Sequence, residues 1–221
     1  MKPLFIFLSL CIGIISNAFS QEIEWQNTIG GSSYDYLYSC LQVSDGGYIL
    51  SGQSSSNISG DKTENSYGGS DYWVVKIDSA GNIQWQNTIG GGNADNLKLI
   101  RSTPDGGYVL GGESFSNISG DKNENNLGGD DFWIVKIDSS GNIQWQNTIG
   151  GNSYEGFASI STTNDGGFIL GGYSISDISG DKTENSYGGY DYWVLKIDSA
   201  GNIQWQNTIG GSDFQSLFTI A

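Results

Sequence analysis

The sequence predicts an all-β fold made of tandem four-stranded antiparallel blades, stacked as in a β-propeller. The first observation is an internal repeat: the string Trp-Gln-Asn-Thr-Ile-Gly-Gly begins at Trp25, Trp85, Trp145 and Trp205, sixty residues apart each time. The second is that each repeat contains four short runs of aromatic and β-branched residues, separated by glycine-containing turns. The third is that no segment after the first twenty residues has the apolar period of a helix. Such a repeat, with four strands in each unit, is typical of propeller blades.

The first element is a signal peptide at residues 1–20. Leu4–Ile15 is an almost unbroken apolar run, and Ala18–Ser20 has the small-x-small pattern of a cleavage site, so the remaining chain is expected to begin at Gln21. The run is shorter than the ~20 residues that cross a bilayer. An uncleaved anchor is the less favoured alternative. We therefore expect an exported protein, in the periplasm, on the outer surface or outside the cell, with no membrane span after cleavage.

The repeat domain is expected at residues 21–221. Within the first unit the predicted strands are a at 36–43, b at 48–50, c at 72–77 and d at 83–89, and each recurs sixty residues later. The four-stranded units are expected at approximately 32–91, 92–151 and 152–211, followed by a partial unit at 212–221.

The turns between these strands are equally readable. Asp45-Gly46-Gly47 predicts a tight hairpin between strands a and b, and Gly81 marks the turn between c and d. The connection between b and c, at about 53–70, is long and polar. Connections of this length usually carry function or fold on themselves.

Strand c is apolar on both faces, because Tyr72, Trp73, Val74 and Val75 are consecutive. A strand with one solvent-exposed face would alternate between apolar and polar residues, so this run favours a sheet packed between two neighbouring sheets. Strand d alternates more and is expected at the outer edge. Both repeated tryptophans, the one in strand c and Trp85 in strand d, are expected to be buried between blades.

The two ends of the repeat array are incomplete. A lone strand d is expected at 23–29 and the start of a strand a at 214–220. Three full blades are fewer than the four to eight of closed propellers. The sequence therefore predicts either an open arc or a piece of a larger propeller, with further blades in a longer chain or self-association through open edges.

Residues 60–85 (GDKTENSYGGSDYWVVKIDSAGNIQW) and 105–112 (DGGYVLGG) carry a family resemblance. They are similar to the tandem repeats of large secreted surface proteins of Bacteroidetes-type bacteria, and the resemblance covers nearly all of the chain after residue 20. It implies a propeller-like repeat region without catalytic residues. Proteins of this kind often carry a separate C-terminal sorting domain for type IX secretion, which these 221 residues do not contain.

Composition excludes several functions. The net charge of −15, from 24 acidic and 9 basic residues, argues against nucleic acid and against anionic membranes as partners. The absence of histidine removes His-based catalysis and His metal ligands. Cys40 is the one cysteine after residue 20 and aligns with Ile100 and Ile160, so we expect it to be buried as a small apolar residue.

Carboxylates are the remaining catalytic option. A glycosidase needs two carboxyl groups in unlike environments, whereas here the acids recur in equivalent copies, as turns require. The recurring acids are Asp61, Asp121 and Asp181; Glu64, Glu124 and Glu184; and Asp71, Asp131 and Asp191. An enzyme is therefore not expected, and no catalytic residue or cofactor is assigned.

Calcium is the one ion that the sequence makes worth considering. Asp61, Thr63 and Asn65 alternate as oxygen donors. However, Ser66 stands where an EF-type loop has glycine, and Tyr72 stands where it has glutamate. The alternative, which we favour, is that Asp61 and Asn65 cap local turns.

Positions that differ between the repeats are the candidates for recognition. All are expected in the b–c connection, which would place them on one rim; unselected variation of exposed loops is an equally good explanation. They are Gln53, Glu113 and Tyr173; Phe115 and Ile175; Tyr67, Leu127 and Tyr187; and Asp130 and Tyr190.

These observations favour an exported, non-enzymatic scaffold for adhesion or protein binding through the b–c connections. The alternatives are a carbohydrate-binding module, which calcium would assist, and a carbohydrate-active enzyme. The expected partner is a protein or a glycan at the cell surface.

Overall fold

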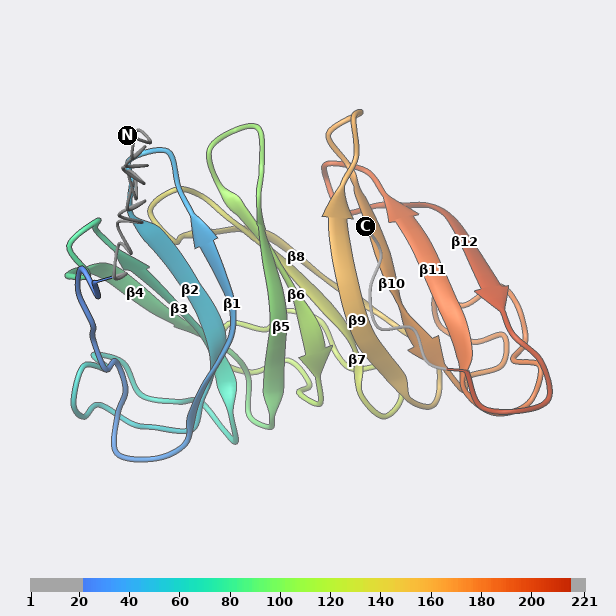
Figure 1. Cartoon of the computed structure of the whole chain (residues 1–221). Helices are drawn as coiled ribbons and strands as arrows, with labels where there is room; N and C mark the ends of the chain where they lie inside the picture. Colours follow the sequence, from blue (N-terminus) through green and yellow to red (C-terminus); the bar gives the residue numbers. More distant parts are fainter. Residues whose placement is uncertain (1–21, 216–221) are drawn as a thin grey trace, which may run out of the picture.

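The computed structural model describes residues 22–215 and confirms the all-β prediction (Figure 1). Its strands form three separate four-stranded antiparallel sheets, each in the order a-b-c-d, and no helix occurs in this part of the chain. Blade 1 contains β1 (Asp35–Gln42), β2 (Tyr48–Ser54), β3 (Asp71–Ile77) and β4 (Ile83–Ile89). Blade 2 contains β5 (Asp95–Ser102), β6 (Tyr108–Ser114), β7 (Asp131–Ile137) and β8 (Ile143–Ile149). Blade 3 contains β9 (Glu155–Thr162), β10 (Phe168–Ser174), β11 (Asp191–Ile197) and β12 (Ile203–Ile209).

The blades converge at their a strands. The closest approaches of backbone between neighbouring blades involve β5 or β9, and β1 runs beside β5 as β5 runs beside β9. Figure 1 shows β4 and β12 far from this line, at the two outer sides of the array. The sheets are therefore arranged radially, with strand a innermost and strand d outermost, as the alternation of strand d predicted.

The predicted end of strand b was wrong. β2, β6 and β10 do not stop at Leu50 and its copies but continue through the small residues to Ser54, Ser114 and Ser174. The glycines serve close approach inside the strand rather than a turn. A Cβ added to Gly112 would collide with the Asn96 carbonyl and lie 2.6 Å from the Tyr72 hydroxyl of the preceding blade.

The core lies between the blades. Ile49, Tyr72 and Val74 of blade 1 pack against Leu97 and Trp133 of blade 2 in one continuous buried cluster. Blades 2 and 3 repeat this arrangement in a second cluster. β3 and β7 are buried along their whole length, which confirms that strand c has no wet face when a blade follows it.

Two burial predictions were wrong in part. The strand c tryptophans are buried, but Trp85 and Trp145 are only half-buried and Trp205 is 49% exposed, because strand d is the outer edge of each sheet. Cys40 is exposed, although Ile100 and Ile160 are buried. The reason is its place in blade 1: its side of the sheet has no preceding blade in the described chain.

The predicted terminal strands have different outcomes. Residues 22–31 form no strand, so the expected strand d at 23–29 was wrong; the described chain provides no strand c to pair with it. The expected strand a at 214–220 falls almost entirely outside the described residues, as does the signal peptide at 1–20. Residues 22–215 contain no helix that is long and apolar enough to cross a membrane.

Candidate functional site

The b–c connections at 55–70, 115–130 and 175–190, here called the rim, are ordered loops along one edge of the array, opposite the a–b hairpins (Figure 1). Each folds on itself through a short antiparallel bridge, Ser59 to Lys62 in the first copy. Lys62 is buried, and its ammonium donates a hydrogen bond to Thr88 Oγ1 and lies 5.6 Å from the centre of the Trp73 ring. Burial lowers the pKa of Lys62. A lysine thus fastens each loop to its own blade, a role that the sequence analysis missed.

Two of the three side-chain oxygens considered for calcium accept hydrogen bonds from backbone N–H groups. Asn65 Oδ1 accepts a hydrogen bond from the Ile58 N–H at 3.1 Å, and Asp61 Oδ2 accepts one from the Gly30 N–H at 3.1 Å. Asp121 and Asp181 repeat the second contact with the unit before them. Between residues 22 and 215 no three His, Cys, Asp or Glu side chains are grouped as a metal site would require. Asn65 caps a turn of its own loop, as the favoured alternative predicted, whereas Asp61 ties the loop to the segment at Gly30 instead of capping a local turn.

Three of the ten predicted recognition positions lie outside the rim. Gln53, Glu113 and Tyr173 are the penultimate residues of β2, β6 and β10, so their assignment to the b–c connection was wrong. The cause is the early end that we predicted for strand b. Gln53 is half-buried and its Oε1 has no hydrogen-bond partner.

Four of the predicted positions gather at the junction of blades 2 and 3. The Glu113 carboxylate accepts a hydrogen bond from the Phe157 N–H at 2.9 Å, and burial raises its pKa. Tyr173 packs edge to face on Tyr190 with ring centres 4.9 Å apart. Burial and the nearby Glu113 and Asp130 carboxylates raise the pKa of Tyr173. This group is mostly enclosed, so it joins blades and offers little surface to a partner.

Tyr67, Leu127 and Tyr187 lie on the rim, where they are 50%, 44% and 60% exposed. Tyr67 leans over the next loop: a Cβ on Gly120 would lie 2.9 Å from its ring. Leu127 leans over Gly180 in the same way. Adjacent loops therefore touch, and the rim is one continuous surface.

The remaining predicted positions sit at the start of the loops. Phe115 is 38% exposed and Ile175 is half-buried. A stronger apolar feature lies nearby and was missed by the sequence analysis. Ile58, Ile118 and Ile178 are the most exposed apolar side chains of their loops, at 62%, 61% and 61%. The sequence does carry a signal for them, because the same apolar residue recurs in every copy of a polar loop. A search restricted to variable positions does not find it.

A second exposed feature is a row of tyrosines on β1 and the turn before it. Tyr34, Tyr36 and Tyr38 follow one another with ring centres 6.2 Å apart and nearly parallel planes. The Lys98 ammonium of blade 2 lies 5.6 Å from the centre of the Tyr38 ring. The other a strands have no such row, because Asn96 and its neighbours replace the tyrosines. The row was not predicted.

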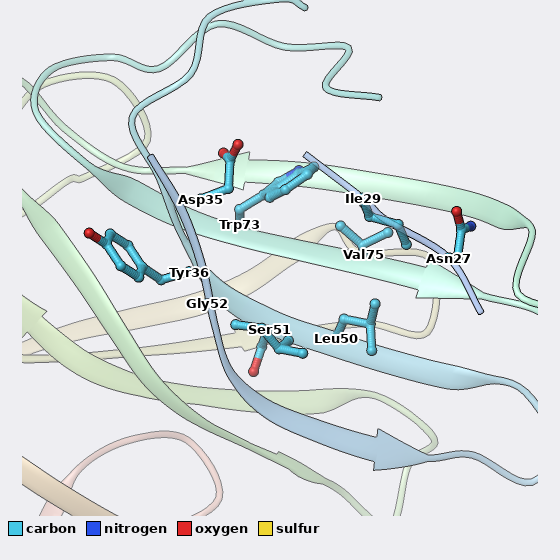
Figure 2. Close-up of a pocket in the computed structure, with 10 residues that line it drawn as sticks. Asn27, Ile29, Asp35, Tyr36, Leu50, Ser51, Gly52, Trp73 and Val75 are labelled. Atoms are coloured by element: carbon cyan, nitrogen blue, oxygen red, sulfur yellow. The ribbon is translucent and has the colours of Figure 1, made fainter. Parts of the chain in front are cut away.

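A pocket of about 240 Å³ opens on the outer side of blade 1 (Figure 2). The segment before β1 forms one wall through Asn27 and Ile29. Leu37, Gly52 and Trp73 from three strands of the sheet form the other. The lining is mostly apolar.

Buried carboxylates mark the junctions between blades. Asp71, Asp95 and Asp131 are fully buried, and Oδ1 of each has no hydrogen-bond partner. Burial raises the pKa of Asp71 to about 6. Burial also raises the pKa of Asp131, and the neighbouring Glu155 raises it further. These groups hold protons more tightly than exposed carboxyls do, yet they face the interior and not a cleft.

No protein-family model matches the chain. The chain is similar to "Regulatory protein FlaEY" of Caulobacter vibrioides, with 26% identity over 143 residues. The match covers 62% of this chain but only 15% of that protein. The chain thus corresponds to a small part of this relative.

Proposed function

We propose that the protein is an exported, non-enzymatic scaffold that binds a protein partner through the rim. The observation that carries this proposal is the repeated exposure of Ile58, Ile118 and Ile178 on a continuous surface. Apolar groups gathered on the surface of an otherwise strongly acidic chain are typical of a protein-binding site. Phe115 and Tyr187 are further exposed apolar side chains of the same loops.

The test is binding to an array of purified extracellular and cell-surface proteins. Replacing Ile58, Ile118 and Ile178 with serine should leave the far-ultraviolet circular dichroism spectrum and the melting temperature unchanged, because these side chains are exposed. It should weaken binding to the same array proteins at least tenfold. As a matched control, serine at Ala80 and Ala200 changes exposed turn residues on the other end of the blades. Unaltered binding by the isoleucine variant would refute the rim as the site.

A second candidate function is carbohydrate binding, which the tyrosine row favours. Exposed, nearly coplanar aromatic rings present the flat apolar faces on which sugar rings stack. A glycan array distinguishes the two candidates: replacement of Tyr36 and Tyr38 with alanine should abolish glycan signals, whereas the isoleucine variant should keep them. Repeating the array with a chelator tests whether calcium assists.

Export is part of the proposal and has its own test. Expression of the chain with residues 1–20 in a bacterial host, followed by N-terminal sequencing of the processed protein, should give Gln21 as the first residue. Retention of Met1 in the cytoplasm would contradict export without bearing on the rim.

A further inference from the structure

The two internal junctions share one recurring contact, in which an aromatic ring of strand c enters the next blade. Tyr72 packs against Trp133 with ring centres 4.9 Å apart and planes tilted by 45°, and its hydroxyl donates a hydrogen bond to the Trp133 carbonyl at 2.9 Å. Phe132 contacts Trp193 in the same way at 5.4 Å. A Cβ on Gly172 would lie 2.7 Å from the Phe132 ring. We call the ring the plug, and the glycine and tryptophan that receive it the socket.

Blade 1 has the same socket without a plug. The pocket of about 240 Å³ is lined by Gly52 and Trp73, which are the counterparts of Gly112 and Trp133 (Figure 2). Leu37 at its edge is 61% exposed, whereas its counterpart Leu97 is completely buried at the internal junction. The pocket is therefore the place that an aromatic ring from a preceding blade would fill.

Blade 3 has the same plug without a socket. Tyr192 stands at the plug position, and it and Val194 are half-buried, although Tyr72 and Val74 are completely buried in blade 1. Ile209 on the same sheet is 52% exposed. The described chain thus offers a plug at one end and an empty socket at the other.

A short segment, residues 22–31, occupies the outer part of the face of blade 1 that carries the open socket. Asn27 Nδ2 donates a hydrogen bond to the Gly81 carbonyl at 2.9 Å, which repeats the contact of Asn87 with Gly141 at 2.7 Å. Residues 22–31 therefore take the position of a preceding strand d, but bring no strand c. β12 carries the same Trp-Gln-Asn-Thr-Ile sequence as residues 25–29.

The other open face has a similar substitute. The Gln215 N–H donates a hydrogen bond to the Tyr190 carbonyl at 2.7 Å, as the Asp95 N–H does to the Ser70 carbonyl at 2.6 Å. In a second copy of the chain, the N–H of Asp35 is the counterpart of the Asp95 N–H and can donate the same hydrogen bond. Residues 22–31 at one open face and Gln215 at the other can thus each be replaced by equivalent residues of a second copy, and the hydrogen bonds that they make are kept.

We propose that a second copy of this chain docks head to tail, with Tyr192 of one copy in the socket formed by Gly52 and Trp73 of the next. β12 of the first copy then replaces residues 22–31 of the second. The exchanged hydrogen bonds are remade by identical or equivalent groups, so the net gain is the burial of the plug, Leu37 and Cys40. Such a contact joins two different surfaces, and it closes into a ring or continues as a chain.

Charge modulates this association. Each copy carries a formal charge of −15, so two copies repel at low ionic strength. Added salt screens this repulsion, while the apolar contact in the socket is unaffected or strengthened. Association should therefore become tighter as the salt concentration rises.

Sedimentation velocity of the purified protein and two end variants tests the proposal. Leu37→Asp disables the socket and Tyr192→Ala removes the plug, and both positions are exposed enough for each variant to fold. The unmodified protein should gain mass with concentration, and each variant alone should stay monomeric. An equimolar mixture should form a dimer that grows no further, because each variant keeps the end that the other lacks. Asn27→Ala should tighten association of the unmodified ends about fivefold, because one competing hydrogen bond is lost.

Ile118→Asp is the control, because it places a charge on the rim and away from both end faces; it should associate like the unmodified protein. Circular dichroism verifies that all variants are folded. A monomeric unmodified protein at every concentration and salt would overturn the proposal. So would a mixture of the two folded end variants that remains monomeric.

Discussion

The ammonium of Lys122 lies 5.2 Å from the centre of the Trp133 ring, in the interior of blade 2. The same nitrogen donates a hydrogen bond to Thr148 Oγ1 of β8. One side chain thus connects the b–c loop, strand c and strand d of a single blade. Burial lowers its pKa to about 8, so the charge is held in place by the ring and the hydroxyl at a cost in solvation.

Lys122→Met tests this connection, because methionine keeps the apolar stem and removes the charge and the donor. We expect the free energy of unfolding at pH 7 to fall by about 1–3 kcal/mol, from the lost cation–π contact and the unsatisfied Thr148 hydroxyl. Urea denaturation followed by tryptophan fluorescence measures it. Lys98→Met, at a partly exposed lysine that also faces an aromatic ring, should cost less than half as much. Equal losses in the two variants would contradict the special role of the buried lysine.

The buried carboxyl groups predict an unusual dependence of stability on pH. The pKa of Asp71 is about 6 in the folded chain against an ordinary value of 3.8, so the folded state binds the extra proton between these values. The free energy of unfolding should then decrease as pH rises from 4 to 6, by about 2 kcal/mol for this group. The exposed Asp105 and Asp165 act oppositely: hydrogen bonds from threonine and lysine lower each pKa to about 2, so their contribution is lost on acidification below 4. Stability should be greatest near pH 4 to 5.

Asp71→Asn isolates the buried group. The amide imitates the protonated acid, so the variant should lose the part of the decrease between pH 4 and 6 that Asp71 contributes, about 2 kcal/mol, and be at least as stable as the unmodified protein at pH 7. Asp78→Asn, at an exposed turn residue, should keep the decrease. Urea denaturation at a series of pH values decides between them, and an Asp71→Asn curve parallel to the unmodified one would refute the assignment.

The repeat made the blades predictable. The sixty-residue period, the consecutive Tyr72–Val75 and the glycine turns placed three of the four strands within a residue or so of their observed bounds, because these signals are local. Strand b was cut short because glycine usually ends a strand. At Gly52 it is needed instead for the approach of β1, and that approach depends on a bulge between Leu37 and Ser39 which no single strand reveals.

The site was less predictable for a different reason. Equivalent positions in a repeat have equivalent neighbours only inside the array, so Cys40 and Ile100 differ in exposure although they align. The search for variable residues led to Glu113 and Tyr173 at a blade junction, where their side chains are half-buried. The exposed Ile58 and its copies do not vary, and their exposure depends on how the loop folds over Lys62.

The plug at the first junction gives a further prediction. Tyr72→Phe removes the hydroxyl that donates to the Trp133 carbonyl, but leaves the ring, and Phe132 shows that the socket accepts it. We expect a loss of about 1 kcal/mol in the free energy of unfolding. Tyr72→Ala empties the socket and should cost about 3–5 kcal/mol, as large-to-small changes of buried aromatic residues do. Urea denaturation of the two variants separates the ring from the hydroxyl; similar losses would show that the hydrogen bond, and not the packing, dominates.

Cys40 offers a direct measure of the open face of blade 1. Its thiol is exposed, so we expect it to react with a thiol reagent in native buffer, even though partial burial raises its pKa and slows the reaction. Ile100→Cys in a Cys40→Ser background places the thiol at the same position of the internal junction, where it should react only after unfolding. In the head-to-tail assembly the first thiol is covered, so its reaction should slow as the protein concentration rises while that of a free small thiol does not. A Cys40 thiol that is as inert as the one at position 100 in dilute protein would show that the face of blade 1 is closed, and with it the socket.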